Sequence, residues 1–398
     1  MHRLASTLGR LPLSRLGPLV ALCGLVAIAV AAYPVHSYGG WVADLQAYRE
    51  GSRAWWHGGD LYGPLPGTPG GATPPFLYPP FALFALTPFT VPPLPSAIVV
   101  TVVVTVAALA VTAYVVARWA WPDAGRRGAA GIAALTTPVF LLFDPLRENL
   151  GLGQVNVWLM ALVAVDCLSP RTRWPRGLLV GLAAAIKVTP AAFLLFFLLR
   201  KDFRAAGTAA IAGSLATGLG FLVAPTESAR FFFGGVLADG TRGNLGRETN
   251  QSLTGALTRL GLPGGWHWAL LIILIAAVLV AAVLVTRRAS PPLALVVNAV
   301  AALLCCPLSW SAHWVWIIPA LLILASHATN LAHRLGVLGS AALFAGGPQR
   351  AFAPRRHLDR LAVCRRERLR ARRPARAARR RVLHPGPHPG AGHPLTTG

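Results

Sequence analysis

Two aspartates stand just beyond the first long apolar stretch of the chain. Asp44 and Asp60 are among only 13 acidic residues in 398. They follow an uncharged run over residues 16–35, which at about 1.5 Å per residue is long enough to cross a bilayer. A carboxylate a few residues outside a span lies at the depth of a lipid headgroup, where it can accept a proton during group transfer. The alternative is that Asp44 caps the short helix that begins at this point.

The composition identifies the elements that must position these acids as membrane segments. Hydrophobic residues make up 55% of the chain and charged residues 13%, and the mean hydropathy is +0.56. A soluble protein of this size would expose too much apolar surface with so many uncharged apolar windows. We therefore expect an all-α polytopic membrane protein with about ten to twelve membrane segments. Several windows contain no charged residue, among them residues 96–117, 205–223, 266–286 and 291–326.

Several chemistries are absent from the sequence. The five cysteines lie in apolar runs or in the tail, with neither metal-ligand spacing nor a paired framework. The chain has no P-loop, no nucleotide-binding glycine motif and no H-E-x-x-H pair. The sequence therefore predicts neither a metal nor a cofactor. The net charge of +24 comes mostly from short loops and the C-terminal tail, which is a topology signal and not a nucleic-acid footprint.

Basic residues set the expected orientation. Arginines precede the first span and fill the short loops between later spans, which predicts that these parts face the cytoplasm. Two long loops, residues 39–73 and 224–265, then face outward. Two apolar stretches do not fit this scheme as single spans. Residues 76–92 are interrupted by Pro79, Pro80 and Pro88 and are expected to be re-entrant. Residues 177–199 should form two short halves that turn near Lys187 and Pro190.

The expected domain boundaries follow from the same pattern. Residues 1–15 form a cytoplasmic N-terminus, 16–344 the membrane domain, and 345–398 a disordered tail rich in Arg and Pro. The last apolar run, residues 335–344, is too short for a span. The tail could instead bind anionic lipid or nucleic acid. It could also result from a frameshift that replaced a final apolar span.

The remaining polar residues collect on the outward side of this topology, in the two long loops and in two turns, one of them over residues 148–156. Polar groups at membrane depth are costly and usually line a functional cavity. Their convergence therefore favours an active site over scattered helix caps. The set consists of Asp44, Asp60, Glu148, Asn149, Gln154, Asn156, Asn250, Gln251 and His313.

Seven short motifs occur in order along residues 16–344, and together with the hydropathy pattern they resemble glycosyltransferase family 87, the polyprenol-phosphate-mannose-dependent mannosyltransferases of the actinobacterial envelope. The resemblance implies a GT-C membrane fold, a polyprenyl-phosphate-mannose donor and a glycolipid or lipoglycan acceptor. It also implies inverting transfer on the outer face of the plasma membrane. The motifs are D-x-x-x-Y (44–48), G-G-D-L-Y (58–62), Y-P-P-F (78–81), G-Q-V-N (153–156), I-K-V-T-P (186–190), N-Q-S (250–252) and P-L-S-W-x-x-H (307–313).

In the family pattern the aspartate of the first outer loop is the catalytic base, and here it is Asp44. Inverting transfer needs one carboxylate to deprotonate the acceptor hydroxyl, while a lipid phosphate leaves as an anion without an acid. Lys187, inside an apolar segment, and His313 are the candidates for binding the donor phosphate. The alternatives are that Lys187 snorkels to the headgroup region and that His313 is an interfacial anchor. The family commonly has two adjacent histidines where this chain has Ala312 and His313.

Other residues of the motifs are candidates for binding sugar. Gln154 and Asn156 suit hydrogen bonds to sugar hydroxyls, or else hydrogen bonds between helices. Asn250 and Gln251, in the second outer loop, suit sugar recognition or a simple turn. We also predict sugar or acceptor contacts for Tyr48, Asp60 and Trp310.

Two other classes of function fit part of the pattern. A transporter or flippase of lipid-linked sugars would use a similar cavity, but it needs access from both faces and is often built from repeated halves. No internal repeat is visible here, and the polar residues gather on one side. A nonenzymatic assembly protein would leave Asp44 and Lys187 unexplained. If the tail is frameshifted, the chain could also be an inactive member of the enzyme family.

Overall fold

The computed structural model describes residues 1–37, 42–66, 74–169, 171–237 and 245–347. The chain divides into two units, Met1–Ala351 and Phe352–Gly398, and the second unit lies outside the described residues. Parts of both predicted outer loops, and almost all of the predicted tail 345–398, also lie outside them.

The described residues form helices and no strand, which confirms the all-α class. Asn250 and Trp310 form an isolated antiparallel bridge. The elements are α1 His2–Arg10, α2 Leu13–Ser37, α3 Ala43–Trp56, α4 Ala82–Leu86, η1 Thr87–Thr90, α5 Leu94–Ala120, η2 Pro122–Ala124, α6 Gly125–Phe140, α7 Asp144–Leu152, α8 Asn156–Leu168, α9 Leu178–Ile186, η3 Thr189–Phe193, α10 Leu194–Leu199, α11 Phe203–Val223, α12 Pro225–Phe232, α14 Leu253–Leu260, α15 Gly264–Arg288, α16 Pro291–Cys305, η4 Ser311–Trp316, α17 Ile317–His327 and α18 Leu331–Gly346.

Within the described residues four helices, α2, α5, α11 and α15, are long and apolar enough to cross a membrane. The stretch Pro122–Phe140 passes the same test only together with α7, from which it is bent by 75°. Large apolar side chains such as Ile272 and Ile273 on α15 are 65% and 62% exposed, as lipid-facing positions should be. The chain is therefore a multi-pass membrane protein. Five further apolar helices in the described residues are shorter, at 10–17 residues. The expected total of ten to twelve membrane segments stays a prediction.

Small residues let these helices approach one another closely. Gly181 on α9 faces α11, and a Cβ atom there would lie only 2.5 Å from the carbonyl oxygen of Ala209. Small residues at such contacts are the usual device for packing helices in lipid, where burial of apolar surface provides little driving force. This contact fixes α9, and with it the position of the residue that follows, Lys187.

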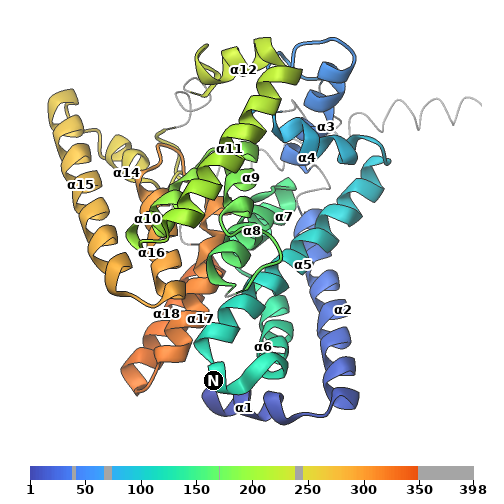
Figure 1. The fold of residues 1–398 in the computed structure, drawn as a ribbon, viewed down its shortest axis with the longest axis vertical. Helices are drawn as coiled ribbons and strands as arrows, with labels where there is room; N and C mark the ends of the chain where they lie inside the picture. Colours follow the sequence, from blue (N-terminus) through green and yellow to red (C-terminus); the bar gives the residue numbers. More distant parts are fainter. Residues whose placement is uncertain (38–41, 67–73, 170, 238–244, 348–398) are drawn as a thin grey trace, which may run out of the picture. The chain divides into compact units, whose positions relative to one another are not determined.

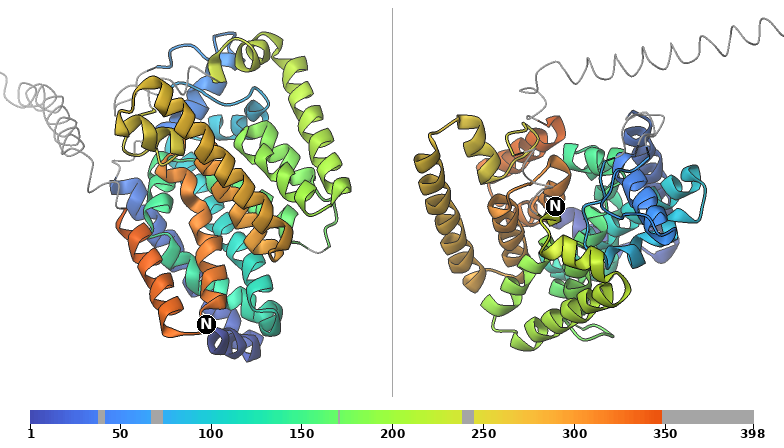
Figure 2. Two further views of the ribbon diagram at one scale, coloured as in Figure 1. Left: turned by 90° about the vertical axis from the view of Figure 1, so that its left-hand side faces the viewer. Right: turned by 90° about the horizontal axis from the view of Figure 1, so that it is seen from above.

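The short helices α3, α4 and α12 gather at one end of the unit Met1–Ala351, and α1 lies at the opposite end (Figures 1 and 2). An ion pair joins the segment that follows α3 to α12, because Arg230 on α12 lies 2.7 Å from the carboxylate of Asp60. The segments that carry the two predicted outer loops are thus on the same side of the spanning helices.

The local structure differs from the sequence expectation at one turn and agrees with it at another. Residues 148–156, expected to be a turn, are helical up to Leu152, because Pro145 and Gly153 supply a helix start and a helix stop around α7. The turn itself is only Gly153–Val155. Residues 177–199 do form short helical pieces, and α9 ends at Ile186 with Lys187 in an extended conformation.

Candidate active site

Helix α3 places Asp44 at its beginning and Tyr48 one turn later. The helix starts at Ala43, after Val42 in the left-handed conformation, and no side chain caps it. The Asp44 carboxylate accepts a hydrogen bond instead from Nε2 of Gln154, at 2.8 Å. The side chain is therefore directed at the turn before α8 and not at the backbone of its own helix.

The position of Gln154 depends on a glycine. Gly153 has φ of 73°, and a Cβ atom there would lie 2.7 Å from Cβ of Leu45. Only glycine allows the turn to adopt this conformation and to pack so closely against α3. The side chain of Asn149 also donates to the carbonyl oxygen of Gln154, at 3.1 Å. The G-Q-V-N motif thus brings Gln154 to Asp44 by backbone geometry.

Two tyrosines complete the surroundings of Gln154. Its Oε1 atom accepts hydrogen bonds from the hydroxyl groups of Tyr48 at 3.3 Å and Tyr78 at 3.2 Å. The two hydroxyls are also 2.8 Å apart. Tyr78 belongs to the Y-P-P-F motif but was not among the predicted site residues, and the motif itself was the signal that pointed to it.

Lys187 enters the same network from the break between α9 and η3. Its Nζ atom donates to Oδ1 of Asn156 at 2.7 Å and lies 3.2 Å from Nε2 of His313. It also lies 5.4 Å from the ring centre of Tyr78, within the range of a cation–π contact. None of the ion pairs among the described residues involves Lys187. The charge is thus held by neutral groups, as a site for an external anion requires.

Asn156 connects the two halves of the network. Its Nδ2 atom donates to the carbonyl oxygen of Ala312 at 2.9 Å and lies 3.4 Å from Oε1 of Gln154. Three elements far apart in the sequence, α3, the α7–α8 turn and η4, therefore meet at Asn156 and Gln154. Six of the predicted site residues belong to this one cluster: Asp44, Tyr48, Gln154, Asn156, Lys187 and His313.

The electrostatics at Asp44 suit a base. Burial away from water raises the pKa of its carboxyl from 3.8 to about 6, while the hydrogen bond from Gln154 and the positive charge of Lys187 act in the opposite direction. A carboxylate with such a pKa is mostly ionised at neutral pH and binds a proton more readily than an ordinary aspartate.

The other predicted residues lie elsewhere. Asp60 is half exposed, pairs with Arg230 and accepts from the backbone N–H of Tyr62 at 2.9 Å. The hydrogen bond from Arg230 holds the pKa of Asp60 below its ordinary value. Asn250 is fully buried, donates to the carbonyl oxygens of Leu245 and Pro307, and accepts from two backbone N–H groups. These contacts tie its loop to the segment that leads into η4.

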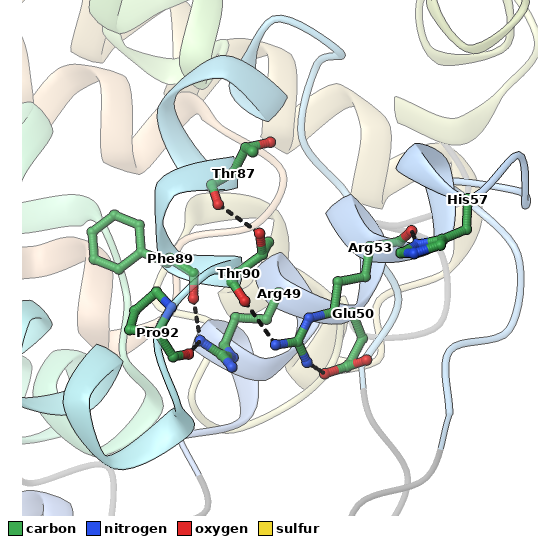
Figure 3. A network of polar contacts seen from close by, with 8 residues as sticks. All are labelled: Arg49, Glu50, Arg53, His57, Thr87, Phe89, Thr90 and Pro92. Atoms are coloured by element: carbon green, nitrogen blue, oxygen red, sulfur yellow. Dashed lines mark hydrogen bonds and ion pairs between the residues drawn. The ribbon is translucent and has the colours of Figure 1, made fainter.

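Arginines on α3 form a second polar network, which was not predicted from the sequence (Figure 3). Arg49 is 3% exposed and donates to the carbonyl oxygens of Phe89 and Pro92. Arg53 bonds Glu50 at 3.0 Å and the carbonyl oxygen of Thr90 at 2.7 Å. Both arginines thereby fasten α3, the helix that carries Asp44, to the end of η1 and the residues after it.

Helices with an apolar surface, a partly buried carboxylate and a lysine held by neutral groups are features that a membrane enzyme acting on a lipid phosphate needs. The model of glycosyltransferase family 87 matches residues 76–307, more than half of the chain, and the chain belongs to this family. Asp44 and Tyr48 precede the matched stretch. Within the described residues no group of three or more His, Cys, Asp or Glu side chains could hold a metal ion.

Curated relatives extend the match beyond those residues. The chain is 38% identical over 331 residues to a polyprenol-phosphate-mannose-dependent alpha-(1-2)-phosphatidylinositol mannoside mannosyltransferase of Mycobacterium tuberculosis, with 78% of each chain covered. It is 40% identical to the protein of the same description in Mycolicibacterium smegmatis, covering 76% of this chain and 73% of that one. A pentamannoside mannosyltransferase of M. smegmatis is 33% identical, with 82% and 80% covered. No solved structure matches the chain.

Proposed function

We propose that the protein transfers mannose from a polyprenyl-phosphate-mannose donor to a glycolipid acceptor of the phosphatidylinositol mannoside class. The names of the relatives support both substrates, at 38% and 40% identity over more than three quarters of this chain. The observation that carries the proposal is the hydrogen-bonded connection from the Asp44 carboxylate through Gln154 and Asn156 to Lys187. It provides a base and a cation in one cluster, which is what phosphate-leaving transfer requires.

In this mechanism the acceptor oxygen forms a bond to the anomeric carbon of mannose. Its proton passes to the Asp44 carboxylate, and the bond between the anomeric carbon and the phosphate oxygen breaks on the opposite face of the sugar. Attack and departure on opposite faces invert the configuration. The electron pair stays with the oxygen of the departing polyprenyl phosphate, which needs no proton from an acid.

Lys187 stabilises the charge that develops on this phosphate, and His313 beside it adds a second nitrogen to the phosphate site. Charge-assisted contacts of this kind are about twice as strong as neutral hydrogen bonds. Gln154 holds the Asp44 carboxylate, and Tyr48 and Asn156 line the sugar. Gln251 and Trp310 contact the acceptor, while Asp60 and Asn250 hold the loops that enclose it.

The reaction takes place on the outer face of the plasma membrane. The basic short loops of the sequence support this orientation. A test is to place single cysteines at the exposed positions His57 and Thr226, in a background without the native cysteines, and to label intact cells with a membrane-impermeant thiol reagent. Both should react, whereas Asp123→Cys should react only after lysis. Protection of either outer position would contradict the orientation.

The direct test of activity uses membranes that contain the protein, a labelled polyprenyl-phosphate mannose and phosphatidylinositol mannoside acceptors. We expect a labelled, more polar glycolipid, and its anomeric configuration should be opposite to that of the donor. Retention of configuration would exclude the single displacement. Movement of intact donor across the bilayer without transfer would indicate a flippase instead.

A further inference from the structure

A cavity of about 220 Å³ lies beside the network, and of its lining residues the mechanism above uses only Gln251. Its wall is built from the start of α7, the segment before α14, η4 and the end of α18. Pockets that enclose a whole drug-sized ligand usually measure ~300–1,000 Å³, so this cavity suits a single ring and not a whole glycolipid or an isoprenoid chain. The wall includes Asp144, Gln251, Ser311, Trp314, Leu343 and Phe344.

Helix η4 separates the cavity from the phosphate site. A 3₁₀-helix has three residues per turn, so Ser311 and Trp314 lie on the same face, and both line the cavity. His313 lies on a different face and contacts Lys187. The carbonyl oxygen of Ala312 accepts from Asn156. One turn of η4 therefore borders both the cavity and the proposed catalytic cluster.

The wall is chemically selective. It offers a carboxylate from Asp144, an amide from Gln251, a hydroxyl from Ser311 and the indole of Trp314, and it contains no cationic side chain. The Asp144 carboxylate lies 3.7 Å from Nη2 of Arg147, which is not part of the wall, so its charge is balanced and the wall offers no cation that would bind a phosphate. A neutral polyol would instead find acceptors, donors and an aromatic face.

Two of these residues have unused hydrogen-bonding capacity. Gln251 uses its amide nitrogen to donate to the carbonyl oxygen of Glu248, at 2.6 Å, which leaves its Oε1 atom as an acceptor. The indole N–H of Trp314 is buried and has no hydrogen-bond partner among the described residues. An unpaired buried donor is costly, and a bound ligand together with a small adjustment of the ring would remove that cost.

We propose that this cavity is a subsite for one mannose residue of the acceptor glycolipid. The proposal rests on the proposed mannosyl transfer, because it assigns the cavity to the acceptor of that reaction. It places the neutral sugar on the Ser311 and Trp314 face of η4 and leaves the donor phosphate on the His313 face. The lipid part of the acceptor stays outside the cavity.

Binding can be measured without any transfer. Saturation-transfer NMR of the full-length protein in nanodiscs, with methyl α-mannoside as the probe, should show sugar signals. The signals should persist in Asp44→Asn and fall in Gln251→Leu and Trp314→Phe. They should stay unchanged in the matched control Trp266→Phe, because Trp266 is 74% exposed at the start of α15. An absent signal with the parent protein, or signals that survive in both cavity variants, would overturn the proposal.

Kinetics then distinguish acceptor from donor. Gln251→Leu should raise the acceptor KM by about 2- to 12-fold, the equivalent of one neutral hydrogen bond, and leave the donor KM unchanged. A rise in the donor KM alone would assign the cavity to the donor and refute the inference. If the parent protein transfers no mannose, the proposed function fails, while the binding experiment still decides whether the cavity holds a sugar.

Discussion

Replacing Asp44 by asparagine is the sharpest test of the proposed mechanism. Asparagine keeps the size of the side chain, and its Oδ1 atom can still accept the hydrogen bond from Nε2 of Gln154, at 2.8 Å in the parent protein. The substitution removes only the negative charge and the basicity. Loss of a general base typically lowers the rate by about 10²- to 10⁴-fold, so we expect kcat to fall by this factor.

The structure also predicts what happens to stability. The pKa of Asp44 rises from 3.8 to about 6 on folding because burial disfavours the charged form. Ionisation therefore destabilises the folded state as the pH rises from about 4 through about 6, by an amount on the order of 2–3 kcal/mol. The asparagine variant lacks this cost and should be at least as resistant to heat at pH 7 as the parent protein. Inactivity with an unchanged or higher Tm would separate catalysis from folding.

The assay is mannosyl transfer in nanodiscs, with donor binding and Tm measured on the same preparation of a parent protein that shows transfer. Asp60→Asn is the matched control. It removes a carboxylate that is half exposed and paired with Arg230, and surface ion pairs contribute little, so activity should change only a few-fold. Normal transfer by Asp44→Asn would remove Asp44 from the mechanism.

Three further predictions follow from the two polar networks. Lys187→Met should lower kcat/KM for the donor by about ten- to over a hundredfold, the equivalent of one charge-assisted contact; unchanged use of the donor would indicate that Lys187 snorkels. Gln154→Leu should raise the pKa of Asp44 above its value of about 6, because the hydrogen bond from Gln154 lowers that pKa. The acid limb of the pH–rate profile should then move to higher pH, and an unmoved limb would contradict the contact. Arg49→Met should lower Tm more than Arg53→Met. Arg49 is 3% exposed, and its loss leaves two carbonyl oxygens unpaired. Equal Tm values for the two variants would contradict this prediction.

The long helices were predictable because a single physical requirement determines them. An uninterrupted apolar run has few alternatives to a spanning helix, and α2, α5, α11 and α15 appear where the sequence predicts spans. The short elements were less predictable. Residues 148–156 include the polar side chains Glu148 and Asn149 and were expected to be a turn, yet residues 148–152 are helical because Pro145 and Gly153 mark the start and the end of α7. The polar side chains indicated exposure there, but Pro145 and Gly153 determined the backbone conformation.

The sequence indicated which polar residues would share a side, but not how each one is used. Asn250 and Gln154 look alike in the sequence as amides in outer segments. In the structure Asn250 satisfies backbone groups of its own surroundings, while Gln154 meets another side chain at each end. That difference depends on contacts across more than 100 positions of the chain, which no local pattern contains. The contacts of Arg49 span about 40 positions, and its partners Phe89 and Pro92 offer only backbone carbonyls, so no local pattern contains them either.

The amide groups between Lys187 and Asp44 have only one consistent orientation. An ammonium group can only donate and a carboxylate can only accept, so Oδ1 of Asn156 must face Lys187 and Nε2 of Gln154 must face Asp44, as observed. The remaining Nδ2 and Oε1 atoms then meet as donor and acceptor, at 3.4 Å. In all three hydrogen bonds between Lys187 and Asp44 the donor lies on the side of the cation and the acceptor on the side of the carboxylate. This arrangement favours a charged Lys187 and an ionised Asp44 at the same time. The resting network therefore holds both groups in the states that the proposed mechanism requires, with no proton to be moved before the acceptor binds.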